Sequence, residues 1–464
     1  MQGTKNIFLT GGAGNMGYRG LMELLEHTTH QITLLVKPSK KNKKRLNPHF
    51  NNSRVRIVWG DLRDYDKVLE CTNGADYVLH VGGMVSPMAD KYPEETMDTN
   101  INAAENIVKA IKSQPEPDKI KLVYIGSVAQ IGHRDVPDHF CGTKEVMTPA
   151  HFDHYAVSKI MAERVVAESG LKYWVSLRQS GILYPALIMK GVDPITFHVP
   201  LRGVLEWATV EDSGRLLLKL CGDDVAEEFW RNFYNISSGK SYRLTNYEFE
   251  CKLMKAISCP PPEKVFKTKW FGLSNFHGCW YTDTDSLENF LHFRYNVSCD
   301  DYFKHIRKNL PWYFSLAKIA PASIIRYFMG KVAHTKGTGT MDWIKTNNEK
   351  KIAAYFGSRE RWENIPSWDE LDKSHPSEEI PDINYGPVFS KPMAEWDIED
   401  MREMAILRGG KCLSESMLKG DVFTKLHWEN STQEQFIASP YYVLMAGYFP
   451  NHRLIEEDKK FYKR

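Results

Sequence analysis

The first 180 residues alternate between short apolar runs and longer segments in which apolar residues recur every three or four positions. The short runs have the length and composition of buried strands, and the longer segments have the period of amphipathic helices. This alternation predicts an α/β fold with a doubly wound parallel sheet. The expected strands are residues 6–10, 32–36, 55–59, 77–81, 122–125 and 174–178, and the clearest expected helices are residues 14–26, 97–112 and 154–169.

A glycine-rich turn follows the first expected strand. Residues 10–17 read TGGAGNMG and lead into the first expected helix. Gly11 or Gly12 would make the tight turn, Gly14 would let the backbone approach a pyrophosphate, and Gly17 would let the helix lie close to the strand. The free N–H groups and the dipole of the helix favour phosphate at this end. The motif therefore predicts a Rossmann-type domain that holds a dinucleotide.

The regular alternation fades beyond residue 184, and 464 residues exceed one ordinary domain. We expect a dinucleotide-binding domain over residues 1–184 and a smaller substrate-binding lobe over 185–330, with some return to the sheet around 205–240. A linker and surface segment, rich in small, polar and proline residues, would cover 331–392. An α/β module would complete the chain over 393–464.

The most apolar stretch, residues 310–329, is interrupted by Lys318, Pro321 and Arg326. We therefore expect no integral membrane segment. Three interpretations remain open for this stretch. It contacts a membrane surface peripherally, it covers an apolar pocket, or it forms two short core helices joined at Pro321.

Charge and cysteine content narrow the functional classes. The chain has 60 lysines and arginines against 58 acidic residues, which gives no global argument for nucleic-acid binding. Its eight cysteines include no CxxC pair, so we expect reduced thiols, a cytoplasmic location and no bound metal. The first strand begins within ten residues of Met1, which leaves no room for a signal peptide.

A candidate catalytic pair lies at the start of the expected helix at 154–169. Tyr155 and Lys159 are four residues apart, so their side chains share one helix face. An ammonium beside a phenol favours the phenolate and would lower the pKa of Tyr155 from about 10 toward neutrality. Ser127 ends a buried strand, and the carboxyl ends of such strands face the ligand crevice. A tyrosine with a solvated lysine is the ordinary alternative, and Ser127 argues against it.

These residues resemble the extended short-chain dehydrogenase/reductase superfamily, which includes the NAD-dependent epimerases and dehydratases. The resemblance extends over about 185 residues and rests on elements in the family's order: TGGAGNMG at 10–17, GDL at 60–62, HVGG at 80–83, Asn100, Ser127 with Gly132, HYAVSK at 154–159, and Arg178. It implies that Tyr155 is the general acid/base, that Lys159 binds ribose and assists Tyr155, and that Ser127 orients the substrate oxygen.

The same resemblance implies the dinucleotide contacts. Asp61 and Leu62 would meet the adenine, and Asn100 would support the backbone of the active site. The complete set of expected contacts is Gly11, Gly14, Asn15, Met16, Gly17, Lys37, Ser39, Lys40, Asp61, Leu62, Val81, Gly82, Asn100, Tyr155 and Lys159.

The turn after the second expected strand bears on the choice of dinucleotide. NAD-specific domains place an acidic residue there, whereas this chain has Lys37, Ser39 and Lys40 and no acid. These residues favour the 2′-phosphate of NADP(H), with NAD as the alternative. A lysine-rich turn is also typical of a solvated loop.

The expected reaction is hydride transfer to or from a small, fairly apolar carbonyl or alcohol. Val128 and Ala129 replace the Asp-Glu pair of the family's dehydratases, and Gln179 and Ser180 stand where sugar-nucleotide enzymes have a Tyr-Phe-Asn run. Two alternatives stay open: an epimerase with tightly bound NAD, and a cofactor-sensing or scaffold protein that binds a partner through its C-terminal extension. We expect a homodimer.

The C-terminal stretch faintly resembles a small zinc-binding module that has lost its ligands. Cys412 remains, but Glu429 follows the tryptophan where the module has a cysteine. Because a structural zinc site needs four ligands, we expect a metal-free remnant. Its role would be dimerisation or covering of the substrate pocket.

Overall fold

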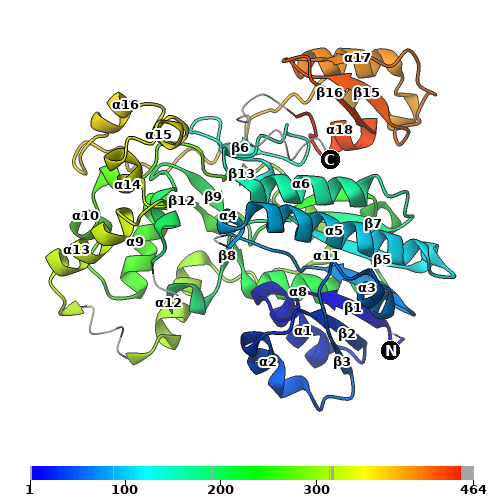
Figure 1. Ribbon diagram of the computed structural model, residues 1–464, viewed down its shortest axis with the longest axis horizontal. Helices are drawn as coiled ribbons and strands as arrows, with labels where there is room; N and C mark the ends of the chain where they lie inside the picture. Colours follow the sequence, from blue (N-terminus) through cyan, green and yellow to red (C-terminus); the bar gives the residue numbers. More distant parts are fainter. Residues whose placement is uncertain (1–2, 87, 190–191, 313, 315–317, 451–464) are drawn as a thin grey trace.

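A computed structural model describes residues 3–86, 88–189, 192–312, 314 and 318–450. Its centre is a seven-stranded, fully parallel sheet in the order β11-β7-β5-β4-β1-β2-β3. This confirms the expected doubly wound sheet (Figure 1). The strands are β1 (Asn6–Thr10), β2 (Gln31–Val36), β3 (Val55–Trp59), β4 (Tyr77–His80), β5 (Lys121–Ser127), β7 (Trp174–Gln179) and β11 (Asn232–Ile236).

Both faces of the sheet are covered because its strands are apolar on both sides. Along β1, Ile7 and Leu9 face one core and Phe8 faces the other. Helices α1 (Asn15–His27) and α8 (Val210–Lys219) pack together on the first face. On the second face lie α3 (Tyr65–Thr72), α5 (Pro93–Lys112) and α6 (His154–Ala167).

Several elements were not expected from the sequence. The edge strand β11 lies in the region 205–240 where a return to the sheet is expected, but the strand itself was not located, because the polar residues of its sequence NFYNI hide the strand pattern. The lysine-rich residues 40–45, for which a solvated loop was the alternative interpretation, belong to the helix α2 (Lys40–Leu46), which Ser39 caps by accepting a hydrogen bond from the backbone of Asn42. Helix α5 begins one turn earlier than expected, with Pro93 in its first turn.

The part in which a substrate-binding lobe is expected, called the substrate lobe below, is built from short strand pairs and small helices. The pairs are β8 (Ile182–Leu183) with β10 (Ala208–Thr209), β9 (Val204–Glu206) with β12 (Arg243–Thr245), and β6 (Phe140–Cys141) with β13 (Trp280–Tyr281). The helices of this part are α7 (Pro185–Met189), α9 (Asn246–Ala256), α10 (Pro262–Val265), α11 (Ser286–Leu291), α12 (Cys299–Asn309) and α13 (Ala322–Ala333). The segment 331–392, expected to be a linker, adds α14 (Thr340–Lys345), α15 (Glu349–Phe356) and α16 (Arg359–Glu363), whose Trp343, Ile352 and Phe356 are buried in the core of the substrate lobe. The short helix α4 (Met88–Lys91) precedes α5.

Two expectations about this part of the chain are corrected. Cys141 and Cys279 form a disulfide between β6 and β13, so not all eight cysteines are reduced thiols. The expectation that the stretch 310–329 forms a pair of core helices fails for its second half, because Pro321 is the N-cap residue of α13, in which only Ala333 is buried. In the first half, residues 313 and 315–317 lie outside the described part. None of the described helices is both long and apolar enough to cross a membrane.

The C-terminal module packs against the outer side of α6 (Figure 1). It consists of α17 (Ile398–Leu407), the antiparallel strands β14 (Lys411–Cys412), β15 (Leu426–Glu429) and β16 (Gln435–Ala438), and α18 (Pro440–Met445). Its buried Trp428 and Tyr442 belong to the same core as the sheet residue Trp174. The module is therefore an integral layer of the fold. Residues 451–464 of the expected module lie outside the described residues.

Candidate functional site

The glycine turn between β1 and α1 has the geometry that the sequence predicts. Gly11 adopts a φ of 70°, a conformation that side chains disfavour, and its carbonyl accepts a hydrogen bond of 2.7 Å from the backbone of Gly14. A Cβ on Gly17 would lie 2.3 Å from the oxygen of Gly11, so only glycine lets α1 start this close to β1. The N-terminus of the 13-residue helix α1 therefore opens directly toward the crevice.

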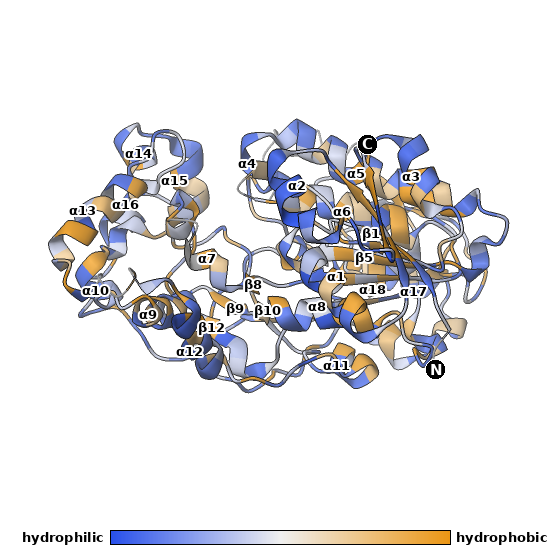
Figure 2. Cartoon of the chain, turned by 90° about the horizontal axis from the view of Figure 1, so that it is seen from below, coloured by the Kyte–Doolittle hydropathy of each residue, from blue (hydrophilic) through white to orange (hydrophobic). Residues whose placement is uncertain are grey.

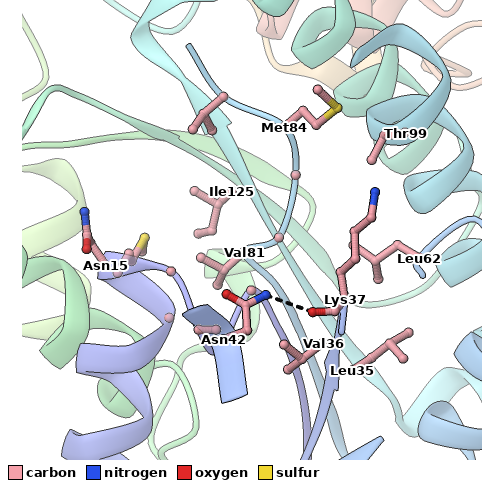
Figure 3. Close-up of a pocket in the computed structure, with 18 of the residues that line it drawn as sticks. Asn15, Leu35, Val36, Lys37, Asn42, Leu62, Val81, Met84, Thr99 and Ile125 are labelled. Atoms are coloured by element: carbon pink, nitrogen blue, oxygen red, sulfur yellow. Dashed lines mark hydrogen bonds between the residues drawn. The ribbon is translucent and has the colours of Figure 1, made fainter. Parts of the chain in front are cut away.

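A cleft of about 490 Å³ runs along the carboxyl ends of the central strands. Figure 3 shows its lining, in which Val81 and Ile125 lie between the glycine turn and the segment around Met84. The expected contact residues that line it are Gly11, Gly14, Asn15, Met16, Gly17, Lys37, Asp61, Leu62, Val81, Gly82, Tyr155 and Lys159. Four other expected site residues, Ser39, Lys40, Asn100 and Ser127, are outside this lining.

The turns that follow β1 and β4 have a geometry that fits a dinucleotide. A Cβ on Gly82 would lie 2.9 Å from the backbone nitrogen of Gly11, so the two backbone turns meet without side chains between them. The hydroxyl of Thr10 accepts the backbone N–H of Gly82 at 2.8 Å and also lies 2.9 Å from Nδ1 of His80. These contacts hold the β1 and β4 turns together, which leaves an open floor for the pyrophosphate.

Tyr155 and Ser127 are brought together at the end of β5. The carboxylate of Asp153 caps α6 by accepting the backbone N–H of Ala156 at 2.9 Å, and Tyr155 lies in the first turn of this helix. Burial raises the pKa of Tyr155 to about 12, and a hydrogen bond with the Ser127 hydroxyl opposes the rise. Ser127 thus lies just behind the cleft wall, in contact with the Tyr155 hydroxyl that lines it.

Lys159 lines the cleft one turn after Tyr155, but its ammonium donates to the carbonyl oxygen of Ile125 at 2.6 Å. Burial lowers the pKa of Lys159 to about 8, and the charge of Glu163 partly offsets this effect. The expected lowering of the Tyr155 pKa by the lysine is not observed, because Tyr155 is buried and its pKa is raised instead. The cost of burying the phenolate exceeds every favourable interaction at that hydroxyl.

Asn100 acts behind the cleft. Its Oδ1 accepts the backbone N–H of Met84 at 2.8 Å, and its Nδ2 donates to the carbonyl of Met84 and to the hydroxyl of Ser158. Met84 belongs to the cleft wall, and Ser158 lies in α6 beside Lys159. Asn100 therefore links the wall of the cleft to the helix that carries Tyr155.

The end of the cleft beyond β2 is a cluster of alternating charges. Nζ of Lys37 lies 3.7 Å from Asp61 and 3.6 Å from Glu95. Hydrogen bonds from Arg63 hold the pKa of Asp61 at about 2, so this carboxylate stays ionised. The lysine that the sequence offers to a 2′-phosphate is already between two carboxylates.

Sequence reasoning missed two residues at this end of the cleft. Lys41 and Asn42 line it from α2, and Nδ2 of Asn42 donates to the carbonyl of Lys37 at 2.9 Å (Figure 3). The helical turn of α2 carries Ser39 and Lys40 outside the lining. Ser39 was the signal from which α2 could have been predicted, because a serine directly before a lysine-rich segment is a typical N-cap residue at the start of a helix.

A second cavity of about 450 Å³ lies between α6 and the substrate lobe. Ser86 lines this second cavity, and the preceding residue, Val85, lines the first cleft. In the same way His154 lines the second cavity and the next residue, Tyr155, lines the first. The two cavities share no lining residue, but their walls meet along the chain at Val85–Ser86 and at His154–Tyr155. Its charged and aromatic lining comprises Asp90, Lys91, Phe152, Asp153, His154, Asp193, His198, Phe276, His277, Trp343, Lys351 and Tyr355.

The charges in this second cavity are interdependent. Burial, with the nearby charge of Asp153, raises the pKa of Asp90 to about 6. Nδ1 of His277 lies 3.3 Å from Asp153, and the Lys351 ammonium lies 3.6 Å from the centre of the Phe152 ring. The cavity is therefore polar and bears both signs of charge.

The described residues 393–450 of the C-terminal module line neither cavity, and its expected role in dimerisation or in covering the substrate pocket stays a prediction. Cys412 is buried in β14. Across the part of the chain that the structure describes, no three His, Cys, Asp or Glu side chains are grouped as metal ligands would be.

The fold and the cleft define a dinucleotide-binding protein of the Rossmann type. Residues 7–181 match the model of the NAD dependent epimerase/dehydratase family, so this part of the chain is a domain of that enzyme family and of the extended short-chain dehydrogenase/reductase superfamily. The family assignment made from the sequence is confirmed. The resemblance of the tail to a zinc module lies outside the match and stays a prediction.

Similar curated proteins cover the same part of the chain. A UDP-glucose 4-epimerase of Rickettsia massiliae is 31% identical over 111 residues, which are 23% of this chain and 32% of the relative. A UDP-N-acetylglucosamine 4,6-dehydratase (inverting) of Campylobacter jejuni is 30% identical over 107 residues, with the same shares. The chain thus spans about a third of the length of the curated relatives it matches.

Solved structures extend the likeness of fold beyond that region. A UDP-glucuronic acid 4-epimerase of Bacillus cereus, with UDP-glucuronic acid and NAD, has a TM-score of 0.53 at 16% identity and covers 65% of this chain and 98% of its own. A dTDP-glucose 4,6-dehydratase of Bacillus anthracis with NAD has a TM-score of 0.52 at 15% identity, covering 67% and 96%. These similarities show a shared fold.

Proposed function

We propose that this chain transfers a hydride between a bound nicotinamide dinucleotide and a hydroxyl- or carbonyl-bearing carbon of a polar small molecule. The carrying observation is that Tyr155 lines the dinucleotide cleft with Ser127 beside its hydroxyl, while its chain neighbour His154 lines the second cavity. When bound, the dinucleotide supplies or accepts the hydride. The substrate would occupy the second cavity, with its reacting oxygen at Tyr155.

The chain's own residues would handle the proton and the orientation. Tyr155 would donate its proton to a carbonyl oxygen, or accept one from an alcohol, while Ser127 holds that oxygen. The raised pKa of Tyr155 makes the neutral phenol the resting form, which suits proton donation. The ammonium of Lys159 would exchange its bond with Ile125 for one with a ribose hydroxyl, beside Tyr155.

The charge cluster supports NAD as the dinucleotide, in place of the NADP(H) preference expected from the sequence. A 2′-phosphate at Lys37 would lie beside the carboxylates of Asp61 and Glu95, which repel it. A ribose hydroxyl brings no such repulsion. The solved structures of similar fold that contain a dinucleotide, from Bacillus cereus and Bacillus anthracis, contain NAD.

The second cavity changes the expected substrate class. The small, fairly apolar substrate was expected because Gln179 and Ser180 stand in place of the Tyr-Phe-Asn run of sugar-nucleotide enzymes. The cavity beside Tyr155 instead presents Asp90, Asp153 and Lys351, which suit a substrate with several hydroxyl or charged groups.

An epimerase is the second candidate, because the 4-epimerase of Rickettsia massiliae is similar over 111 residues of the Rossmann domain. It would need the same residues but return the hydride to the opposite face of the substrate. The two candidates differ in whether the dinucleotide changes redox state over a complete turnover.

The test begins with the full chain as purified. Mass spectrometry of the nucleotide released on denaturation, followed by turnover with nucleotide-linked sugars and polyhydroxy ketones, identifies dinucleotide and substrate. A net change in NADH absorbance would identify an oxidoreductase. An isomerised product with no net change in NADH absorbance would identify an epimerase. With the substrate found, Tyr155→Phe should lower kcat by about 10²–10⁴-fold while NAD binding persists.

Tyr65→Phe, a change at an exposed hydroxyl near Ser113, is the matched control and should keep full activity. Turnover by Tyr155→Phe at the control rate would remove Tyr155 from the mechanism. Failure of the full chain to bind either NAD or NADP would overturn the proposed function.

A further inference from the structure

Helix α13 has an apolar surface that no described part of the chain covers. Ile325, Met329 and Val332 pack against the core of the substrate lobe. On the other side, Ile324, Tyr327 and Phe328 are 49%, 61% and 54% exposed. A helix with apolar residues on both sides is ordinarily buried, so the outward side of α13 calls for a partner.

The chain segment that contains α13 carries one sign of charge, and Glu263 of the neighbouring α10 is paired with Lys373. From residue 302 to residue 341 the chain has seven lysines and arginines and no aspartate or glutamate. Helix α13 lies at the outer edge of the lobe, away from the parallel sheet (Figures 1 and 2). Ile319, just before the helix, is 79% exposed and extends the apolar surface.

A shallow pocket of about 460 Å³ opens beside this surface. It is lined by the cationic or titratable side chains of Lys267, Arg326, Lys331 and His334, together with the rings of Trp270 and Tyr327. The Arg326 guanidinium donates to the carbonyl of Lys264 at 2.6 Å, which fixes its position without cancelling its charge. No carboxylate among the described residues forms an ion pair with Lys267, Arg326 or Lys331.

We propose that the outward side of α13, with this pocket, docks on a membrane surface that contains anionic phospholipid. The exposed Ile324, Tyr327 and Phe328 would enter the boundary between headgroups and acyl chains, and the cationic pocket would receive a phosphate headgroup. Because none of the described helices can cross a membrane, the attachment is peripheral.

Charge complementarity selects this occupant over a second copy of the chain. A two-fold contact through α13 would bring Arg326 and Lys331 of both copies together, with no acidic residue in residues 302–341 to compensate. An anionic lipid surface supplies the missing negative charge. The proposal is independent of the reaction assigned to Tyr155.

The docking has a consequence for access to the substrate cavity. The chain leaves α13 and within a few residues lines the second cavity with Thr335, Gly337 and Thr338. A membrane-bound α13 therefore places that cavity close to the lipid surface.

The test is cosedimentation of the full chain with sucrose-loaded vesicles. Vesicles of phosphatidylcholine with about a third phosphatidylglycerol should bind it at 0.1 M NaCl, pure phosphatidylcholine should bind it at least tenfold less, and 0.5 M NaCl should release it. Each cation near such a surface contributes about fivefold to binding, equivalent to ~1 kcal/mol.

Two variants and two matched controls locate the surface. Lys331→Glu should weaken binding at least fivefold, and Ile324→Ser should weaken it by a similar factor. Lys419→Glu and Ile406→Ser change an exposed lysine and an exposed isoleucine of the C-terminal module and should bind like the unaltered chain. Circular dichroism confirms that each variant is folded.

Equal binding to neutral and anionic vesicles, or unchanged binding of both α13 variants, would overturn the proposal. A dimer in analytical ultracentrifugation that Ile324→Ser dissociates, with no vesicle binding by the unaltered chain, would instead assign α13 to a second copy. Retained binding when inorganic phosphate is present at 10 mM excludes a pocket that serves only free phosphate.

Discussion

The ammonium of Lys159 lies 2.6 Å from the carbonyl oxygen of Ile125, so a charged side chain of α6 is held against the backbone of β5 inside the protein. The side chain is 5% exposed, and burial lowers the pKa of Lys159 to about 8. A buried lysine of this kind opposes folding and is retained where a function requires it. This position matches the proposed role of Lys159 as a ribose ligand.

Lys159 should therefore give the protein a stability that increases with alkaline pH. The folded-state pKa of about 8 is below the usual 10.5, so the unfolded chain binds more protons between these values. The free energy of unfolding should gain about 2 kcal/mol from this group between pH 7 and 10. Urea titrations at both pH values should show this gain reduced in Lys159→Met.

The same variant should bind NAD more weakly, since a proposed ribose contact is lost. Lys112→Met, at the end of α5, removes an exposed lysine and should follow the pH dependence of the unaltered chain. An equal gain with pH in Lys159→Met and in the unaltered chain would show that the lysine is not buried in its charged form.

Lys37 provides a test of dinucleotide preference. Because Asp61 and Glu95 lie within 4 Å of its ammonium, we expect NAD to bind at least tenfold more tightly than NADP. Glu95→Gln removes one of the two carboxylates and should narrow that ratio by improving NADP binding. Isothermal titration calorimetry with both dinucleotides measures it.

Glu105→Gln, an exposed change further along α5, is the control and should leave the ratio unchanged. If the unaltered chain binds NADP more tightly than NAD, the expected NAD preference is wrong and the NADP(H) preference predicted from the lysine-rich turn is correct.

The parts of the site that follow local rules were predictable from the sequence. The four-residue spacing of Tyr155 and Lys159 and the glycines at 11, 14 and 17 act through their own helix or turn. The pairing of Lys37 with Glu95 was not predictable, because it depends on how α5 lies across the end of β2. The second cavity likewise joins α6 to residues almost 200 positions later, such as Lys351.

The elements that were missed have physical reasons too. Strand β11 is an edge strand with an asparagine on each side of its apolar centre, so its sequence shows no clear alternation of apolar and polar residues. Helix α13 has an apolar pattern typical of core, yet its outward residues are exposed. Only the folded arrangement shows which of its two apolar sides meets the lobe.

His80 should weaken the fold in acid. This side chain is 2% exposed, with Nδ1 at 2.9 Å from the Thr10 hydroxyl, and burial lowers its pKa to about 3. Between pH 6.5 and 3 the unfolded chain binds more protons, so stability falls as pH falls through this window. From pH 7 to 5 the loss from His80 should be about 2 kcal/mol.

His80→Asn should lose about 2 kcal/mol less than the unaltered chain over the same pH interval in urea titrations. The exposed His427 serves as the comparison, and His427→Asn should behave like the unaltered chain. Parallel pH curves for both variants would mean that His80 is protonated in the folded protein.

The C-terminal module should stabilise α6 through a buried ion pair. Nη2 of Arg178 lies 2.8 Å from Oε1 of Glu163, both side chains are fully buried, and the same nitrogen donates to the carbonyl of Ala446 at 2.8 Å. The Tyr442 hydroxyl donates to the carbonyl of Ile160 at 2.9 Å. The Tyr442 contact thus meets the helix that carries Tyr155 directly, and the Ala446 contact reaches it through Arg178 of β7.

Loss of one partner of such a pair leaves an uncompensated buried charge, so Arg178→Met should lower the free energy of unfolding by about 3–5 kcal/mol. Tyr442→Phe removes one hydrogen bond and should cost about 1–2 kcal/mol. Tyr173→Phe, whose hydroxyl meets Glu227 at the surface, is the control and should change stability by less than about 0.5 kcal/mol. If Tyr442→Phe matches that control in urea titrations, the module packs on α6 without stabilising it through this contact.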